Sequence, residues 1–101
     1  MTYKRKYQYN ASNLSDKRFR ELVSLGEVVC RNLIVDYTNS PEDFGSVESL
    51  KSVILGIAPR QIGISIKSSK NDKIRLIEEE IVKTAALNLF EEFCAFASIE
   101  I

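Results

Sequence analysis

The spacing of apolar residues along the first third of the chain predicts a long amphipathic helix. Between Leu14 and Tyr37 the apolar side chains recur every three or four residues, as on a helix with one face in a core. Gly26 falls on this apolar stripe, and we expect it to mark the close approach of another helix. Asn13 or Ser15 can cap the helix, because each side chain has an oxygen that accepts backbone N–H groups.

The same spacing predicts a second long helix near the end of the chain. Residues 72–98 contain no Gly or Pro. One apolar stripe runs from Ile74 to Ala85, and a second stripe beside it runs from Val82 to Phe96. We therefore expect this helix to pack on more than one side.

A shorter helix is predicted between the two long ones. Ser40 is expected to cap it, with Pro41 in the first helical position, where the missing N–H does no harm. Phe44 is expected on its apolar face. The helix should end within 56–59, because Gly and Pro terminate helices.

Two segments alternate between apolar and polar residues and predict short strands. In residues 2–9 the Tyr residues all occupy odd-numbered positions, and in residues 61–67 the Ile residues all occupy even-numbered positions. Such side chains would lie on one face of a strand. A disordered basic arm is the competing interpretation of the first segment. The predicted fold class is α+β, helix-dominated, in the order β-α-α-β-α. The alternative is an all-α bundle with a disordered N-terminal arm.

Length and composition limit the range of functions. The 101 residues are enough for one small domain, 1–101, in which 1–12 would be an arm or an edge strand. The chain contains no His, which excludes Ser-His and Cys-His catalysis and His metal sites within it. The four glycines are scattered and form no phosphate-binding loop. We therefore expect no enzyme activity, no cofactor and no metal.

Cysteine usage and the lack of targeting signals indicate the compartment. Cys30 and Cys94 lie far apart in apolar surroundings and are expected to be reduced and buried. The charged N-terminus is not followed by the apolar region of a signal peptide, and no apolar run is long enough to span a membrane. These features predict a cytoplasmic protein that does not enter a membrane.

Charge is distributed unevenly, although 14 basic residues balance 14 acidic ones. Residues 1–20 hold six basic residues and one acidic residue, whereas residues 78–101 hold six acidic residues and one basic residue. In one interpretation these are solvated faces that attract each other within the fold or across a dimer. In the other, each is a patch that binds a partner.

The candidate binding residues follow this charge distribution. Basic and aromatic residues interleave at the start of the chain, a pattern that suits stacking on unpaired bases and also suits protein interfaces. The predicted binding residues are Tyr3, Lys4, Arg5, Lys6, Tyr7, Tyr9, Lys17, Arg18 and Arg20. Glu91 and Glu92 form a second, acidic candidate patch.

Together these patterns favour a small non-catalytic binding or regulatory module that acts by protein–protein contact. Its size and lack of catalytic groups suggest an inhibitor or immunity-type protein of microbial or viral origin. The expected partner is another protein, including a second copy in a homodimer. The alternative is a nucleic-acid-binding regulator that uses the basic, Tyr-rich N-terminal segment.

Overall fold

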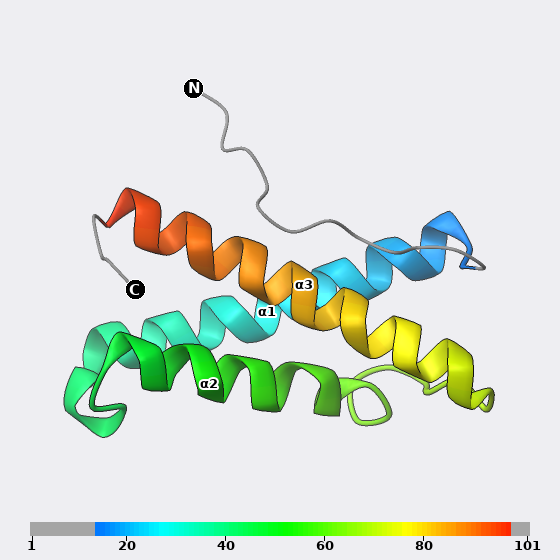
Figure 1. The fold of residues 1–101 in the computed structure, drawn as a ribbon, viewed down its shortest axis with the longest axis horizontal. Coiled ribbons are helices and arrows are strands. Elements are labelled where there is room, and N and C mark those ends of the chain that lie inside the picture. The colour runs from blue at the N-terminus through cyan, green and yellow to red at the C-terminus, as the bar shows by residue number, and fades with distance from the viewer. Residues whose placement is uncertain (1–13, 98–101) are drawn as a thin grey trace.

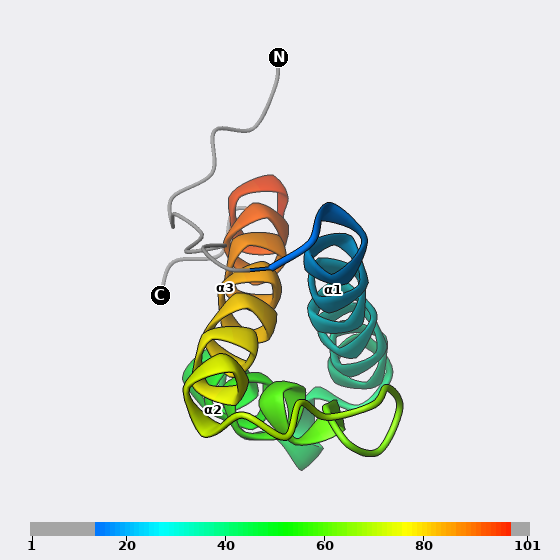
Figure 2. The same ribbon diagram turned by 90° about the vertical axis from the view of Figure 1, so that its right-hand side faces the viewer.

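The computed structural model describes residues 14–97, which form three α-helices joined by turns (Figure 1). In chain order the elements are α1 Asp16–Asn39, the 3-10 turn η1 Pro41–Asp43, α2 Val47–Ile57, the 3-10 turn η2 Ala58–Gln61 and α3 Asp72–Phe96. Helices α1 and α3 run in the same direction and cross each other, while α2 runs back along them (Figures 1 and 2). No helix in 14–97 is long and apolar enough to cross a membrane.

The crossing of α1 and α3 depends on a glycine. A Cβ added to Gly26 would lie 2.3 Å from the carbonyl oxygen of Val82 and 2.9 Å from the Cβ of Ala85. Because real Cβ atoms do not approach other atoms so closely, only glycine allows this contact between the two backbones. The prediction that Gly26 marks the close approach of another helix is confirmed.

The core lies between the three helices and includes both cysteines. Cys30 and Cys94 are buried and have free thiols, as predicted. Burial raises the pKa of the Cys30 thiol from 9.0 to about 12. The buried core residues are Leu22, Val29, Cys30, Leu50, Ile54, Ala58, Ile81, Val82, Ala86, Phe90 and Cys94.

The predicted α+β class is wrong, because the part of the chain that the structure describes is helical and contains no strand. Instead of a strand, residues 61–67 form a tight turn in which the Gly63 N–H donates to the Ile66 carbonyl at 2.7 Å. Gly63 has a φ of +93°, which turns the chain back on itself. The all-α alternative agrees with these helices; its arm, and the strand predicted over 2–9, lie outside the described residues.

The alternation in 61–67 has a different cause from the one predicted. Ile62 and Ile66 pack against the core from the two ends of the turn and are joined by an isolated β-bridge. Ile64 lies between them and is 75% exposed. A period of two therefore arises from a turn, because no second segment in 14–97 pairs with it to form a sheet.

The predicted start of the middle helix is also wrong. Ser40 makes no side-chain cap bond, and the turn after it ends before Gly45, whose φ of +82° interrupts the helix. Helix α2 begins at Val47, where the Ser46 hydroxyl accepts the Ser49 N–H at 3.1 Å. The ends of the long helices agree better, since the Ser15 hydroxyl caps α1 as expected.

Candidate functional site

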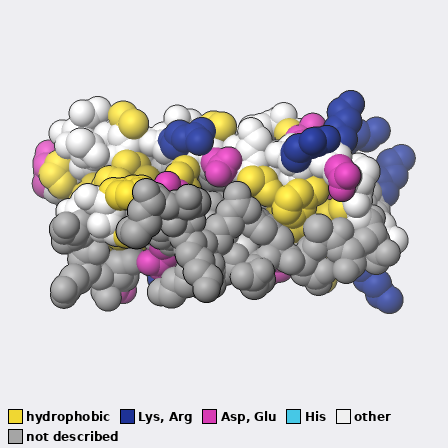
Figure 3. Space-filling view, turned by 90° about the horizontal axis from the view of Figure 1, so that it is seen from above, with side chains coloured by type: hydrophobic (Ala, Val, Ile, Leu, Met, Phe, Trp, Pro, Cys, Tyr) yellow, Lys and Arg dark blue, Asp and Glu magenta, His cyan; other side chains and the backbone are white. Residues whose placement is uncertain are grey.

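The parallel course of α1 and α3 brings both of their N-termini to the same end of the molecule. The connector, residues 62–71, crosses this end between α1 and the start of α3 (Figure 2). Lys and Arg side chains gather there, at the right of Figure 3. We call this region the basic end; its cations are Lys17, Arg18, Arg20, Lys67, Lys70, Lys73 and Arg75.

These cations oppose the helix dipoles instead of complementing them. The N-terminus of a helix carries a partial positive charge, so acidic residues stabilise it and basic residues do not. Lys17 and Arg18 nevertheless lie in the first turn of α1, and Lys73 lies in the first turn of α3. No α-helix in 14–97 has a basic residue in its last turn. Asp16 and Asp72 in the same first turns complement the dipoles, so only part of the charge at these N-termini opposes local stability.

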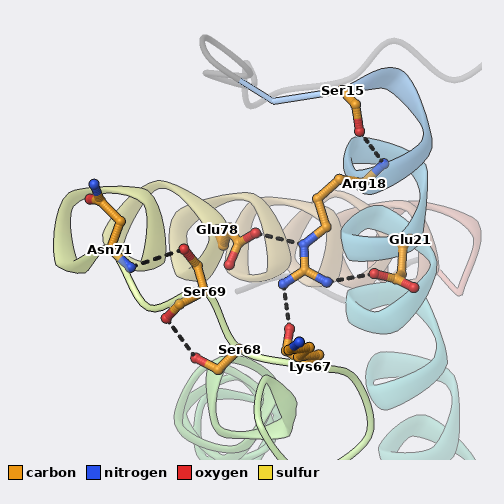
Figure 4. A network of polar contacts seen from close by, with 8 residues as sticks. All are labelled: Ser15, Arg18, Glu21, Lys67, Ser68, Ser69, Asn71 and Glu78. Carbon is orange, nitrogen blue, oxygen red and sulfur yellow. Dashed lines mark hydrogen bonds and ion pairs between the residues drawn. The ribbon is translucent and has the colours of Figure 1, made fainter.

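Arg18 organises the polar side chains of the basic end (Figure 4). Its Nε donates to Glu78 Oε2, its Nη1 donates to Glu21 Oε1, and its Nη2 donates to the Lys67 carbonyl, each at 2.6 Å. The guanidinium therefore joins α1, the connector and α3. The hydrogen bond to Glu78 is the main reason that the pKa of Arg18 is raised above its ordinary value.

Glu78 is the buried partner in this network. Its side chain is only 2% exposed, whereas that of Arg18 is 21% exposed. The second carboxylate oxygen, Oε1, is buried and has no hydrogen-bond partner among residues 14–97. An unsatisfied buried acceptor costs about 1–3 kcal/mol, so this oxygen is a source of binding energy for any donor that reaches it.

An open pocket of about 310 Å³ lies beside this carboxylate. Arg18, Glu78 and the connector form its walls, and Figure 4 shows the free oxygen of Glu78 on the side that faces the connector. The connector contributes Lys67, Ser68, Ser69 and Lys70. The lining therefore combines a buried acceptor with two serines and two exposed lysines.

A second hollow of about 350 Å³ adjoins the first, because Ser68 lines both. Its apolar walls are Ile62 and Leu76, and Leu76 is 64% exposed. Asp72, Arg75 and Glu79 surround these apolar side chains. An exposed apolar centre with a charged rim is the composition of a protein interface.

The structure separates the residues that the sequence singled out. Lys17, Arg18 and Arg20 belong to the basic end, in the first turns of α1. Glu91 and Glu92 lie near the end of α3, at the other end of the molecule (Figure 1). Tyr3, Lys4, Arg5, Lys6, Tyr7 and Tyr9 lie outside the described residues.

This separation bears on the two interpretations of the charge distribution. Because α1 and α3 are parallel, the cations that open α1 lie far from the carboxylates that close α3 (Figure 1). Glu91 instead contacts Lys51 of α2, with Nζ and Oε1 4.0 Å apart. The two charged segments do attract each other at one described pair, because Arg18 of 1–20 donates to Glu78 of 78–101 at 2.6 Å.

Glu78, Leu76 and the connector residues were not predicted from the sequence as site residues. A signal for two members of the network was present: Arg18 lies four residues before Leu22, and Glu78 lies four before Val82. Each is a charge on an apolar stripe, which requires an ionic partner if the stripe is buried. No such signal marks the connector, because its fold depends on contacts with the helices.

Comparisons with protein-family models, curated proteins and solved structures give no match. Among residues 14–97 there is also no group of three or more Cys, Asp or Glu side chains arranged to hold a metal ion.

Proposed function

We propose that this protein is a small non-catalytic binding module that contacts a partner protein through its basic end. The observation that carries the proposal is the hollow around Leu76, an exposed apolar side chain at the centre of a charged surface. A few residues buried at the centre of a protein interface supply most of its affinity, while a charged rim steers the encounter.

Several features favour a protein partner over a nucleic acid. Acidic side chains alternate with the cations of the basic end, among them Asp16, Glu21 and Asp72, and these would repel phosphates. Asp72 is also paired with Arg75. A nucleic-acid surface needs a broader excess of positive charge. A protein partner can match both signs and also fill the apolar hollow.

Site-specific photo-crosslinking tests this proposal. A photoreactive amino acid at position 76 is placed in the hollow, and the same group at Val35, which is 56% exposed on the last part of α1, serves as the control. In an extract of the cells that express this protein, the group at position 76 should form a crosslink to one partner protein. The group at position 35 should not crosslink to that protein.

The captured protein must then bind directly. Once purified, it should bind the wild-type chain at a fixed stoichiometry, and Leu76→Ser should weaken binding at least tenfold while Val35→Ser leaves it unchanged. Equal crosslinking from both positions, or an affinity that Leu76→Ser leaves unchanged, would overturn the proposal.

A nucleic-acid-binding regulator is the second candidate, because Lys17, Arg18 and Arg20 lie in the first turns of α1, at the end of the molecule that also holds the N-terminus of α3 (Figure 1). It predicts binding of single-stranded nucleic acid that weakens steeply with salt and is lost in Lys17→Gln/Arg20→Gln. It also predicts loss of binding on substitution of Lys4, Arg5 and Lys6 by Ala. Binding that survives both sets of changes excludes this candidate.

The proposal includes a homodimer and a cytoplasmic location. Phe96, the last residue of α3, is 72% exposed, which supports a contact with a second copy through the end of α3. Free buried thiols at Cys30 and Cys94 support a reducing compartment. Light scattering at micromolar concentration tests the dimer, which a mass of one chain would exclude.

A further inference from the structure

The pocket beside Glu78 presents a hydrogen-bonding requirement that residues 14–97 do not meet. Arg18 holds the carboxylate in place by donating a hydrogen bond from Nε to Oε2, while Oε1 has no partner among the described residues. Because Glu78 is already 98% shielded from solvent, a donor that reaches Oε1 need not first strip water from it. A pocket occupant that pairs with Oε1 therefore supplies an N–H or O–H group.

The charge around the pocket restricts the occupant further. Arg18 is neutralised by two carboxylates, those of Glu78 and Glu21. Lys67 and Lys70 line the same pocket and form no ion pair with any other residue in 14–97. A cationic amine would satisfy Glu78 but would be repelled by the two lysines. A phosphate would suit the lysines, but its oxygens would face an acceptor.

A segment of acidic polypeptide meets both requirements. Its main-chain N–H groups are neutral donors, and its carboxylates pair with Lys67 and Lys70. Because Ser68 lines both hollows, one extended segment can place an N–H at Glu78 and an apolar side chain against Leu76. We infer that the basic end binds an acidic segment with one apolar residue, and that Glu78 Oε1 accepts one of its main-chain N–H groups. This inference rests on the proposed function and specifies the partner's chemistry.

The test uses a fluorescent probe peptide with a single Leu between two pairs of Asp, so that the Leu sets the register. Binding is followed by fluorescence anisotropy in low-salt buffer. In a set of variants of the peptide, each main-chain N–H is replaced in turn by an ester oxygen. One ester should weaken binding at least tenfold and the others much less. Equal effects at every position would overturn the inference.

Glu78→Gln provides the matched protein variant. Arg18 still requires an acceptor, so the Gln carbonyl takes the place of Oε2 and its NH₂ group replaces the free oxygen. The variant should bind the unmodified probe at least tenfold more weakly and should no longer distinguish it from the sensitive ester. A variant that still makes this distinction would contradict the role of Glu78. The ester scan uses the wild-type chain and does not depend on how Glu78→Gln folds.

Further controls separate this inference from the proposed function. The double variant Lys67→Gln/Lys70→Gln should bind the probe more weakly, and a probe with Lys in place of Asp should not bind to the wild type. If Leu76→Ser weakens binding of the probe but every ester variant binds equally well, this inference fails and the proposed function stands. If crosslinking from position 76 finds no protein, the proposed function fails. An oligothymidine that displaces the probe in a manner dependent on Lys67 and Lys70 would assign the pocket to phosphate and overturn the inference.

Discussion

Gly26 sets how closely α1 and α3 approach each other. With Ala85 and Ala86 opposite it, the contact is made of small side chains and backbone, and no flexible side chain is present that could move aside. Packed interiors accommodate added atoms poorly, because the surrounding groups are already in contact. The relative placement of the two long helices, and with it the shape of the basic end, therefore depends on this residue.

Gly26→Ala should destabilise the protein by about 1–3 kcal/mol, because the new methyl group would overlap the Val82 carbonyl. Gly56→Ala is the matched control, since it lies in α2 with no atom within 4 Å of the added Cβ. That change should stabilise the protein by about 0.5–1 kcal/mol, as Ala does in an open helical position. Urea unfolding measures both; equal effects would contradict the described crossing.

The buried thiol of Cys30 makes stability depend on alkaline pH. Its pKa is about 12 in the folded chain against 9.0 when unperturbed, so the unfolded chain loses this proton first. Between these values the unfolded state binds fewer protons, and the free energy of unfolding falls as pH rises. Below pH 9 this contribution to the pH dependence is absent.

Cys30→Ala removes this titration. Urea unfolding between pH 8 and about 10.5 should show a steeper loss of stability in the wild type than in Cys30→Ala, because all other groups titrate equally in both. Parallel pH profiles would show that the thiol is not shielded in the way that the structure describes.

At the scale of elements, capping residues explain where each helix starts. Ser15, Ser46 and Asn71 each accept a backbone N–H through the side chain, at 3.1 Å. Ser40 looks equally suitable in the sequence, but its side chain makes no cap bond and the turn after it spans only Pro41–Asp43. The cap of α2 therefore depends on the backbone conformation of Gly45, which composition alone does not reveal.

Ser46→Ala should lower the free energy of unfolding by about 1 kcal/mol, the usual loss for an N-cap hydroxyl. Ser40→Ala should change it by much less, because its side chain makes no cap bond. A comparison by thermal or urea unfolding distinguishes the two. A larger loss from Ser40→Ala than from Ser46→Ala would place the start of the helix at Pro41.

The sequence predicted the local features of the fold better than the long-range ones. The long helices, the reason for Gly26 and the buried thiols follow from patterns within a few residues. The turn at Gly63 was mistaken for a strand, because alternation of Ile62, Ile64 and Ile66 does not tell whether a partner strand exists. The pocket could not be predicted, since Arg18 meets Glu78 and Lys67 only through tertiary packing.

At the scale of the whole molecule, the charges are polarised from end to end. The N-termini of both long helices lie among the cations of the basic end (Figures 1 and 3). Glu91 and Glu92 lie towards the opposite end, where α3 terminates. Because helix dipoles carry positive charge at their N-termini, the dipoles of α1 and α3 add to the polarity of the side chains. Such a field orients a charged partner before contact.

This arrangement predicts opposite effects on stability and on binding. Lys73→Glu places an acidic residue in the first turn of α3 and should stabilise the isolated protein by about 0.5 kcal/mol. The same change should weaken binding of the acidic probe. Lys73→Gln should give intermediate values of both, measured by urea unfolding and by anisotropy. A loss of stability in Lys73→Glu would mean that the lysine has a structural role.

Mapping of the probe on the ¹⁵N-labelled protein by NMR tests the binding surface most directly. Titration of the acidic probe should shift the amide signals of Ser68, Ser69 and Leu76 most strongly and leave those of Val35 and Glu92 unchanged. Shifts centred on Val35 or Glu92, or none at saturating probe, would contradict the assignment of the basic end as the contact surface.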